Sequence, residues 1–249
     1  MADYDNRAIR GQSAAQAGLY DAGLRAYMLR VYNYMLVGLG LTGATAWVTA
    51  NTAFGTLFIQ QSVVNGHPVV GLTVLGLIAL FAPLGLVLFL SFRINKMSVS
   101  AAQTTFWIYA GLMGIAIAPV LLIYTGASVA EVFFITAATF GAMSLYGYTT
   151  KRDLSGWGSF LFMGLIGIII AMIVNIFLHS AMMQFVISVI GVLIFTGLTA
   201  YDTQSIKESY SANMDGTAAG RGAVIGALRL YLDFVNLFLM LLQLLGNRR

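Results

Sequence analysis

Two neighbouring segments decide the fold class: GSFLFMGLIGIIIAMIVNIFL at residues 158–178 and MMQFVISVIGVLIFTGLTAY at residues 182–201. Neither contains a charged residue. Each has roughly 20 residues, and a helix of that length, rising about 1.5 Å per residue, crosses a hydrocarbon layer of about 30 Å. The two segments therefore predict two consecutive membrane-spanning helices.

The rest of the chain repeats this pattern, with short charged clusters between apolar runs. Only 9% of the 249 residues are charged and 59% are hydrophobic, against about 25% charged residues in a typical soluble domain. We predict further spans at residues 27–50, 69–91, 101–124, 129–150 and 223–245. The sequence therefore predicts an all-α integral membrane protein, with a polar tail at residues 1–26 and one polytopic transmembrane domain at residues 27–249. Cysteine is absent, which excludes disulfides and thiolate metal sites.

Positive charge is confined to alternate connections between the predicted spans. One set contains Arg7, Arg10, Arg25, Arg30, Arg93, Lys96, Lys151, Arg152, Lys207 and Arg221, whereas the connections near Asn65, Tyr124 and His179 contain no Lys or Arg. The positive-inside rule then places the N-terminus in the cytoplasm. Arg248 and Arg249 follow the last span, which leaves open whether that span crosses the membrane or re-enters. The net charge of +4 does not indicate a nucleic-acid partner, because no basic stripe with interleaved aromatic residues accompanies it.

Four of the charged residues in or beside the predicted spans stand out: Asp202, Arg229, Asp233 and Arg93. A charge inside a bilayer is costly and usually functional. All four fall in the half of the membrane nearest the basic connections, since Arg229 and Asp233 lie only about 12 and 18 Å along a helix that starts at Arg221. Two simpler interpretations stay open: Arg229 and Asp233 are four residues apart and could neutralise each other, and Asp202 could be a solvated carboxylate near a helix end.

The last span also has a polar face. Spacings of three, four and seven residues place its small and polar side chains on one side of a helix: Gly222, Gly226, Arg229, Asp233, Asn236 and Gln243. Such a stripe is expected to face the bundle interior or a water-filled cavity. A tightly bound metal is not expected, because two carboxylates fall short of the six to eight oxygen ligands that calcium takes.

Two segments resemble a known family. Residues 199–207, TAYDTQSIK, and residues 230–238, LYLDFVNLF, are similar to signatures of the transmembrane Bax inhibitor motif family, in particular its bacterial members. The resemblance implies a bundle of six helices around a central C-terminal seventh, in a bacterial inner membrane. It also implies that Asp202 and Asp233 pair as a pH sensor beside a calcium-permeable path, with Arg93 matching the arginine that interacts with the pair. Residues 77–86 contain no acid, whereas family members that leak calcium carry a glutamate there.

The function expected from these observations is a pH-sensitive calcium leak gated by a buried aspartate pair. Two carboxylates in contact titrate as a coupled pair, and protonation would weaken a latch between them and Arg93. The alternative is a non-conducting regulator that binds a membrane protease or another membrane protein, as some bacterial relatives do. A proton-coupled transporter ranks third, because no inverted repeat is visible.

No enzymatic activity and no cofactor are expected. Intramembrane aspartyl proteases place their second aspartate in a Gly-x-Gly-Asp motif, whereas Leu230, Tyr231 and Leu232 precede Asp233 here. A retinal protein needs a Schiff-base lysine in its last helix, and residues 223–245 contain no lysine. The expected partners are the lipid bilayer, calcium as a transported ion in transit past Asp202 and Asp233, and one membrane protein in the regulator interpretation.

Overall fold

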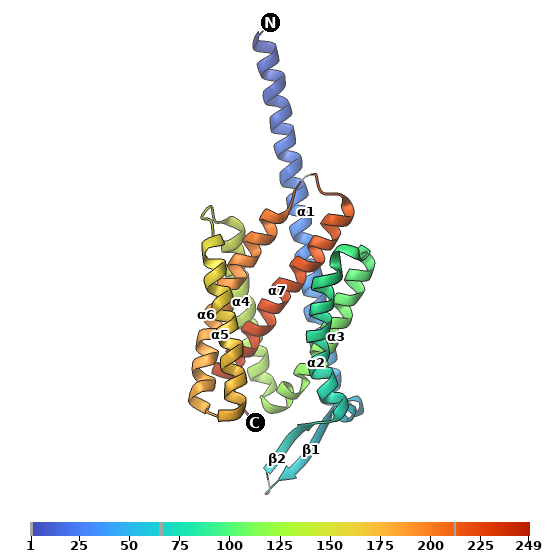
Figure 1. Cartoon of the computed structure of the whole chain (residues 1–249), viewed down its shortest axis with the longest axis vertical. Helices are drawn as coiled ribbons and strands as arrows, with labels where there is room; N and C mark the ends of the chain where they lie inside the picture. Colours follow the sequence, from blue (N-terminus) through green and yellow to red (C-terminus); the bar gives the residue numbers. More distant parts are fainter. Residues whose placement is uncertain (1, 65–66, 212) are drawn as a thin grey trace.

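The computed structural model describes residues 2–64, 67–211 and 213–249, and the side chains of residues 20–60, 71–211 and 213–249. Within these residues the chain forms seven α-helices, two short 3-10 helices and one antiparallel hairpin (Figure 1). Their bounds are α1 (Ala2–Asn51), η1 (Ala53–Leu57), β1 (Ile59–Val64), β2 (His67–Leu72), α2 (Val74–Arg93), η2 (Ile94–Lys96), α3 (Val99–Ile123), α4 (Gly126–Thr149), α5 (Ser155–Leu178), α6 (Ala181–Ser209) and α7 (Gly216–Leu245). The prediction of an all-α membrane protein is confirmed. Helices α2 to α7 are each long and apolar enough to cross a membrane, and α1 is the seventh helix.

The predicted boundaries need three corrections. The span expected at 69–91 begins only at Val74, because residues 67–72 pair with β1 and the Thr73 side chain caps α2 by accepting a hydrogen bond from Gly76 N–H. The helix expected at 27–50 is continuous from Ala2 in α1, so the polar tail at 1–26 is part of a longer helix. Helix α6 continues eight residues beyond the expected end at 201, to Ser209, which places Asp202 inside a helix and not at its end.

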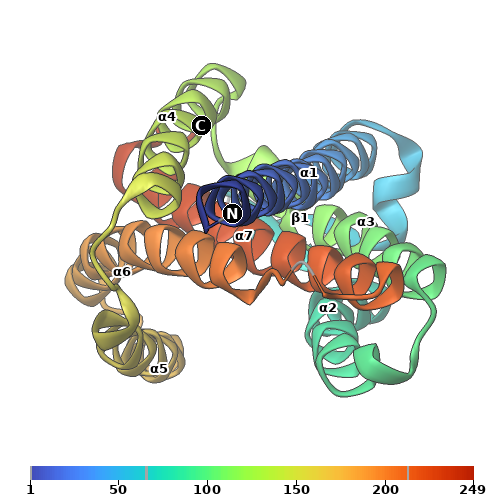
Figure 2. The same cartoon turned by 90° about the horizontal axis from the view of Figure 1, so that it is seen from above.

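Helix α7 lies at the centre of the bundle. In its most apolar stretch 72% of the residues are buried, against 11 to 33% in the other five candidate spans. It contacts α1, α3, α4 and α6, and in the view along the bundle it passes between α1 and α6 (Figure 2). This confirms the predicted arrangement of six helices around a central seventh.

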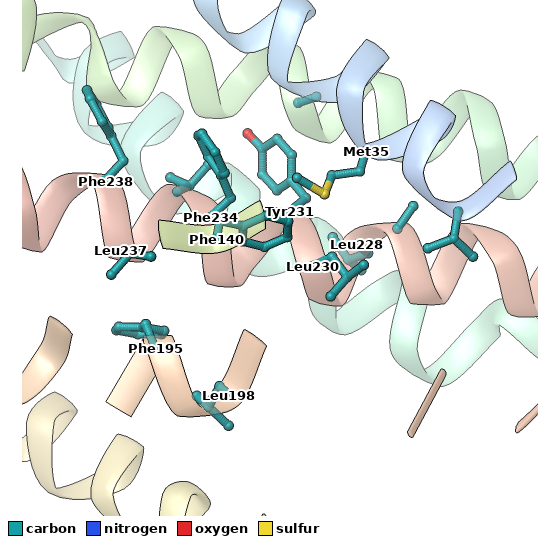
Figure 3. Close-up of a cluster of buried hydrophobic side chains, with 14 of the residues drawn as sticks. Met35, Phe140, Phe195, Leu198, Leu228, Leu230, Tyr231, Phe234, Leu237 and Phe238 are labelled. Carbon is teal, nitrogen blue, oxygen red and sulfur yellow. The ribbon is translucent and has the colours of Figure 1, made fainter. Parts of the chain in front are cut away.

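The core forms where three outer helices meet α7 (Figure 3). The α7 side chains Leu228, Leu230, Tyr231, Phe234, Leu237 and Phe238 pack there against Met35 of α1, Phe140 of α4, and Phe195 and Leu198 of α6. By contrast, large apolar side chains on the outer faces are uncovered, such as Phe92 at 84% and Phe177 at 79% exposure. Exposed apolar surface of this extent suits contact with lipid tails. Close packing between helices, and not burial from water, therefore holds the bundle together.

Helix α7 runs from one end of the bundle to the other. It starts at the end where α2, α4 and α6 also end, which carries the basic connections and is called the basic end below (Figure 1). Its C-terminal extension is fixed at the opposite end: Thr125 N–H donates to Asn247 O at 3.0 Å, Arg249 N–H donates to Ile123 O at 2.9 Å, and Asn247 N–H donates to Ser128 Oγ at 2.9 Å. Helix α7 therefore spans the bundle and does not re-enter, which resolves the question left open by the sequence.

Candidate functional site

The structure brings Asp202 and Asp233 together between α6 and α7. Asp202 is half-buried in α6, and Asp233 is 4% exposed in α7. Their carboxyl groups are close enough for a hydrogen bond to each other. The contact exists because α6 continues past residue 201 and packs along α7 over the segment that holds both aspartates.

The buried carboxyl oxygen Asp233 Oδ2 has no N–H or O–H donor among the described residues. A buried acceptor without a donor is costly, by about 1–3 kcal/mol. An ionised carboxylate only accepts hydrogen bonds, so two carboxyl groups can bond each other only when one of them carries a proton. A hydrogen bond between these two carboxyl groups therefore requires a proton that they share.

Arg229 is the cation that acts on the pair. It lies one helical turn before Asp233 on α7, and its charge interacts with the carboxyl groups of both Asp202 and Asp233. Arg229 therefore does not pair with Asp233 alone, as the i, i+4 spacing suggested, because its charge also acts on Asp202. The side chain of Arg229 is exposed, whereas the adjacent α7 residues Leu228 and Leu230 are buried.

The structure places Arg93 differently from the expectation that it would latch the pair. Its side chain is exposed at the C-terminal end of α2, and Arg229, not Arg93, supplies the positive charge that acts on the two carboxyl groups. Helix α2 packs mainly on α3. A latch contact between Arg93 and the aspartate pair stays a prediction.

The polar stripe of α7 does not converge on one site. Asn236 is half-buried, and its Nδ2 donates to Leu232 O of its own helix at 2.8 Å. Gln243, near the opposite end, accepts a hydrogen bond from Ser188 Oγ of α6 at 2.8 Å and bonds Gln184. Asn236 is therefore satisfied locally, and Gln243 fastens α7 to α6.

A hydroxyl chain next to Asp202 was not foreseen from the sequence. Tyr32 Oη of α1 lies 2.7 Å from Ser144 Oγ of α4, and Ser144 Oγ lies 3.0 Å from Thr203 Oγ1 of α6. Ser, Thr and Tyr are common in the predicted spans, so nothing in the sequence distinguishes these three. The chain fixes the α6 backbone beside Asp202 to two other helices.

Two cavities border α7, the helix that carries Asp233. A cavity of about 370 Å³ at the basic end lies between α1, η2, α6 and α7, and Arg221 and Arg229 line it. A groove of about 1060 Å³ runs between α1 and α4 and reaches Ser144 and Phe234. The groove lining is mostly apolar, so it does not suit a bare cation.

The described residues contain no group of three or more His, Cys, Asp or Glu side chains arranged to hold a metal ion. Calcium usually takes six to eight oxygen ligands. Asp202 and Asp233 could supply a few of these to an ion in transit, and water or backbone carbonyls would have to supply the rest.

Comparisons with known proteins cover nearly the whole chain. Residues 24–249 match the protein family described as "Inhibitor of apoptosis-promoting Bax1". The chain is 46% identical to inner membrane protein YbhL of Escherichia coli over 92% of this chain and 94% of YbhL. It is 47% identical to an uncharacterized protein of Rickettsia prowazekii, over 92% and 93% of the two chains, and 45% identical to one of Caulobacter vibrioides over the full length of both.

Proposed function

The chain belongs to the Bax inhibitor-1 family, and from this premise we propose that it is a non-enzymatic, pH-sensitive calcium leak protein whose pH sensor is Asp202 with Asp233. The observation that carries the proposal is the contact between these two carboxyl groups on the two helices α6 and α7. Asp233 is the one acidic side chain among the buried polar and charged residues of the described chain. Buried ionisable groups in membrane helices usually mark ion or proton pathways.

The pH response follows from the shared proton. When the pair loses it, two negative charges face each other, and charges at a separation of about 4 Å repel by about 4 kcal/mol at an effective dielectric constant of about 20. That repulsion is comparable with the stability of many helix contacts, so α6 and α7 must separate or Arg229 must move closer. Either movement changes the packing at the basic end, which is the gating step in this proposal.

A cation on this path passes Asp202 and Asp233, between α6 and α7. By the positive-inside rule the basic end faces the cytoplasm, and the chain is a multi-pass protein of the bacterial inner membrane, as the name of its relative YbhL states for that protein. The glutamate that calcium-leaking relatives carry in the second span is missing at residues 77–86, so Asp202 and Asp233 are the acidic groups left to guide a cation.

The test is calcium entry into liposomes that contain the purified protein, measured across pH. Wild type should leak calcium at a rate that changes with pH, and Asp202→Asn and Asp233→Asn should each remove the change because Asn cannot release a proton. The matched control is Asp153→Asn, which alters an exposed carboxylate in the α4–α5 connection and should keep the wild-type profile. Unchanged pH profiles in both Asp202→Asn and Asp233→Asn would refute the sensor.

The alternative function is a non-conducting regulator that binds a membrane protease or another membrane protein. The groove of about 1060 Å³ between α1 and α4 favours it, since its apolar lining opens beside the exposed outer faces of the helices. The same liposome experiment separates the two functions. Wild-type protein that is folded but passes no calcium at any pH would leave the regulator as the function to pursue.

A further inference from the structure

The cavity at the basic end has an unusual charge for the mouth of a cation path. Arg221 and Arg229, two turns apart on α7, both line it. Among the lining residues that the structure describes, none is Asp or Glu. Two guanidinium groups without a lining carboxylate repel cations, and they attract anions.

The first arginine has unused hydrogen-bonding capacity inside the cavity. Arg221 Nη1 donates to Asn95 O of η2 at 2.9 Å, which holds the start of α7 against the α2–α3 connection. Its Nε is buried and has no acceptor among the described residues. A guanidinium group offers five N–H donors in a planar fork that matches a phosphate or carboxylate. An anion in the cavity would offer acceptors to the N–H groups of Arg221 that have none among the described residues.

The remaining lining suits a phosphate group. The hydroxyl groups of Tyr27 and Ser205 come from α1 and α6, whereas Ser209 Oγ of α6 already donates to Ile206 O at 2.7 Å. Gly222 lets Tyr27 Oη approach the backbone of α7 in this lining, since an added Cβ there would meet that oxygen at 3.0 Å. Arginine with hydroxyl donors is a common recognition set for phosphate oxygens.

The charge balance leaves room for an anion even with the aspartate pair nearby. None of the described lining residues is acidic, so the positive charge of Arg221 has no counter-ion in the lining. The volume of about 370 Å³ falls in the range of about 300–1,000 Å³ that small-ligand sites occupy. We propose that this cavity is a binding site for a phosphate-bearing anion, held by Arg221 and Arg229.

Binding is tested with inorganic pyrophosphate as the probe, on the full-length protein in detergent at constant ionic strength. Wild type should bind it saturably by calorimetry, and Arg221→Gln should weaken binding at least tenfold. Arg221→Lys, which keeps the charge but loses the planar fork, should fall between them. The matched control is Arg152→Gln, which removes an exposed arginine at the same end outside this lining and should bind like wild type.

A second variant tests the cavity independently, in case Arg221→Gln fails to fold. Ser205→Leu replaces a lining hydroxyl by a larger apolar group and should also weaken binding at least tenfold, without touching the contact between Arg221 and Asn95. The proposal is overturned if wild type neither binds pyrophosphate saturably nor is stabilised by phosphatidylglycerol more than Arg221→Gln is. It is also overturned if both Arg221→Gln and Ser205→Leu bind like wild type. Because binding is measured without ion flux, this result does not depend on whether the protein conducts calcium.

The phosphate could belong to a soluble molecule or to a lipid headgroup, and a second set of measurements separates the sources. The unfolding temperatures of wild type and Arg221→Gln are compared in nanodiscs of phosphatidylcholine alone and of phosphatidylcholine with phosphatidylglycerol. Greater stabilisation of wild type by phosphatidylglycerol, without binding of pyrophosphate, assigns the site to a lipid headgroup. Binding of pyrophosphate that is unaffected by phosphatidylglycerol assigns it to a soluble anion.

Discussion

The contact between Gly147 of α4 and Ala200 of α6 offers the sharpest test of how the aspartate pair is positioned. A Cβ added at Gly147 would lie 2.9 Å from both the carbonyl carbon and the Cα of Ala200, and closer still to its carbonyl oxygen, whereas ordinary contacts begin at 3.4 Å. Backbone atoms cannot rotate away as a side chain can, so α6 must shift by about half an ångström or more. Ala200 is two residues before Asp202, and the shift would therefore reach the pair.

The magnitude follows from two opposing effects of Gly147→Ala. Overpacking in a close-packed interior costs about 1–3 kcal/mol, while replacing glycine by alanine within a helix stabilises it by about 0.5–1 kcal/mol. The control is Gly141→Ala on the same helix, because a Cβ there meets nothing within 4 Å. Both variants share the gain in helix propensity, so the difference between them isolates the clash. We expect Gly147→Ala to be less stable than Gly141→Ala by about 1–3 kcal/mol.

The measurement is unfolding in mixed micelles with a rising fraction of sodium dodecyl sulfate, followed by tryptophan fluorescence. Equal free energies of unfolding for Gly147→Ala and Gly141→Ala would show that α4 and α6 can separate at no cost. The close approach would then not be what fixes α6 beside α4, and the reasoning about the position of Asp202 would fail.

Two further contacts give predictions of their own. Tyr231→Phe removes the hydroxyl that lies 2.6 Å from Thr42 Oγ1 in the core; it should lower the free energy of unfolding in the same assay by about 0.5–1.5 kcal/mol, and an unchanged value would mean that this contact adds nothing. Gln204→Leu removes the side chain whose Nε2 donates to Arg152 O at 2.8 Å and whose Oε1 accepts from Leu154 N–H at 2.8 Å. Amide exchange in the α4–α5 connection, followed by mass spectrometry, should become faster in that variant, and exchange at the wild-type rate would contradict a fastening role for Gln204.

The spans could be predicted because a membrane helix must be apolar over a fixed length. Their ends could not, because a helix continues for as long as it finds packing partners. In α6 the hydropathy signal stops near residue 201, yet Ile206 is buried and Gln204 bonds the α4–α5 connection, so the helix extends to Ser209. The hairpin of β1 and β2 was missed although the sequence contains Asn65-Gly66 between two β-branched runs, which is a common hairpin signal.

The aspartates of the site could be predicted, and Arg229 was one of two arginines that the sequence offered as their cation. Acidic residues are rare in the apolar runs, so Asp202 and Asp233 stand out in the sequence alone. Which arginine faces them depends on the rotation of each helix and on the placement of α2, which packs on α3. Neither property can be derived from residue spacing, so the sequence could not choose between Arg93, which the family resemblance favoured, and Arg229, whose charge acts on both carboxyl groups in the structure.

The two ends of α7 are held differently, and this difference determines which end moves when the charge of the aspartate pair changes. At the opposite end the residues after α7 are fixed by hydrogen bonds to the α3–α4 connection, and Gln243 is bonded to α6. At the basic end the helix borders a cavity of about 370 Å³. A close-packed core transmits a displacement and does not absorb it. We therefore expect repulsion or attraction at Asp233 to move the basic end of α7, toward or away from the cavity that holds Arg221 and Arg229, while its C-terminal end stays in place.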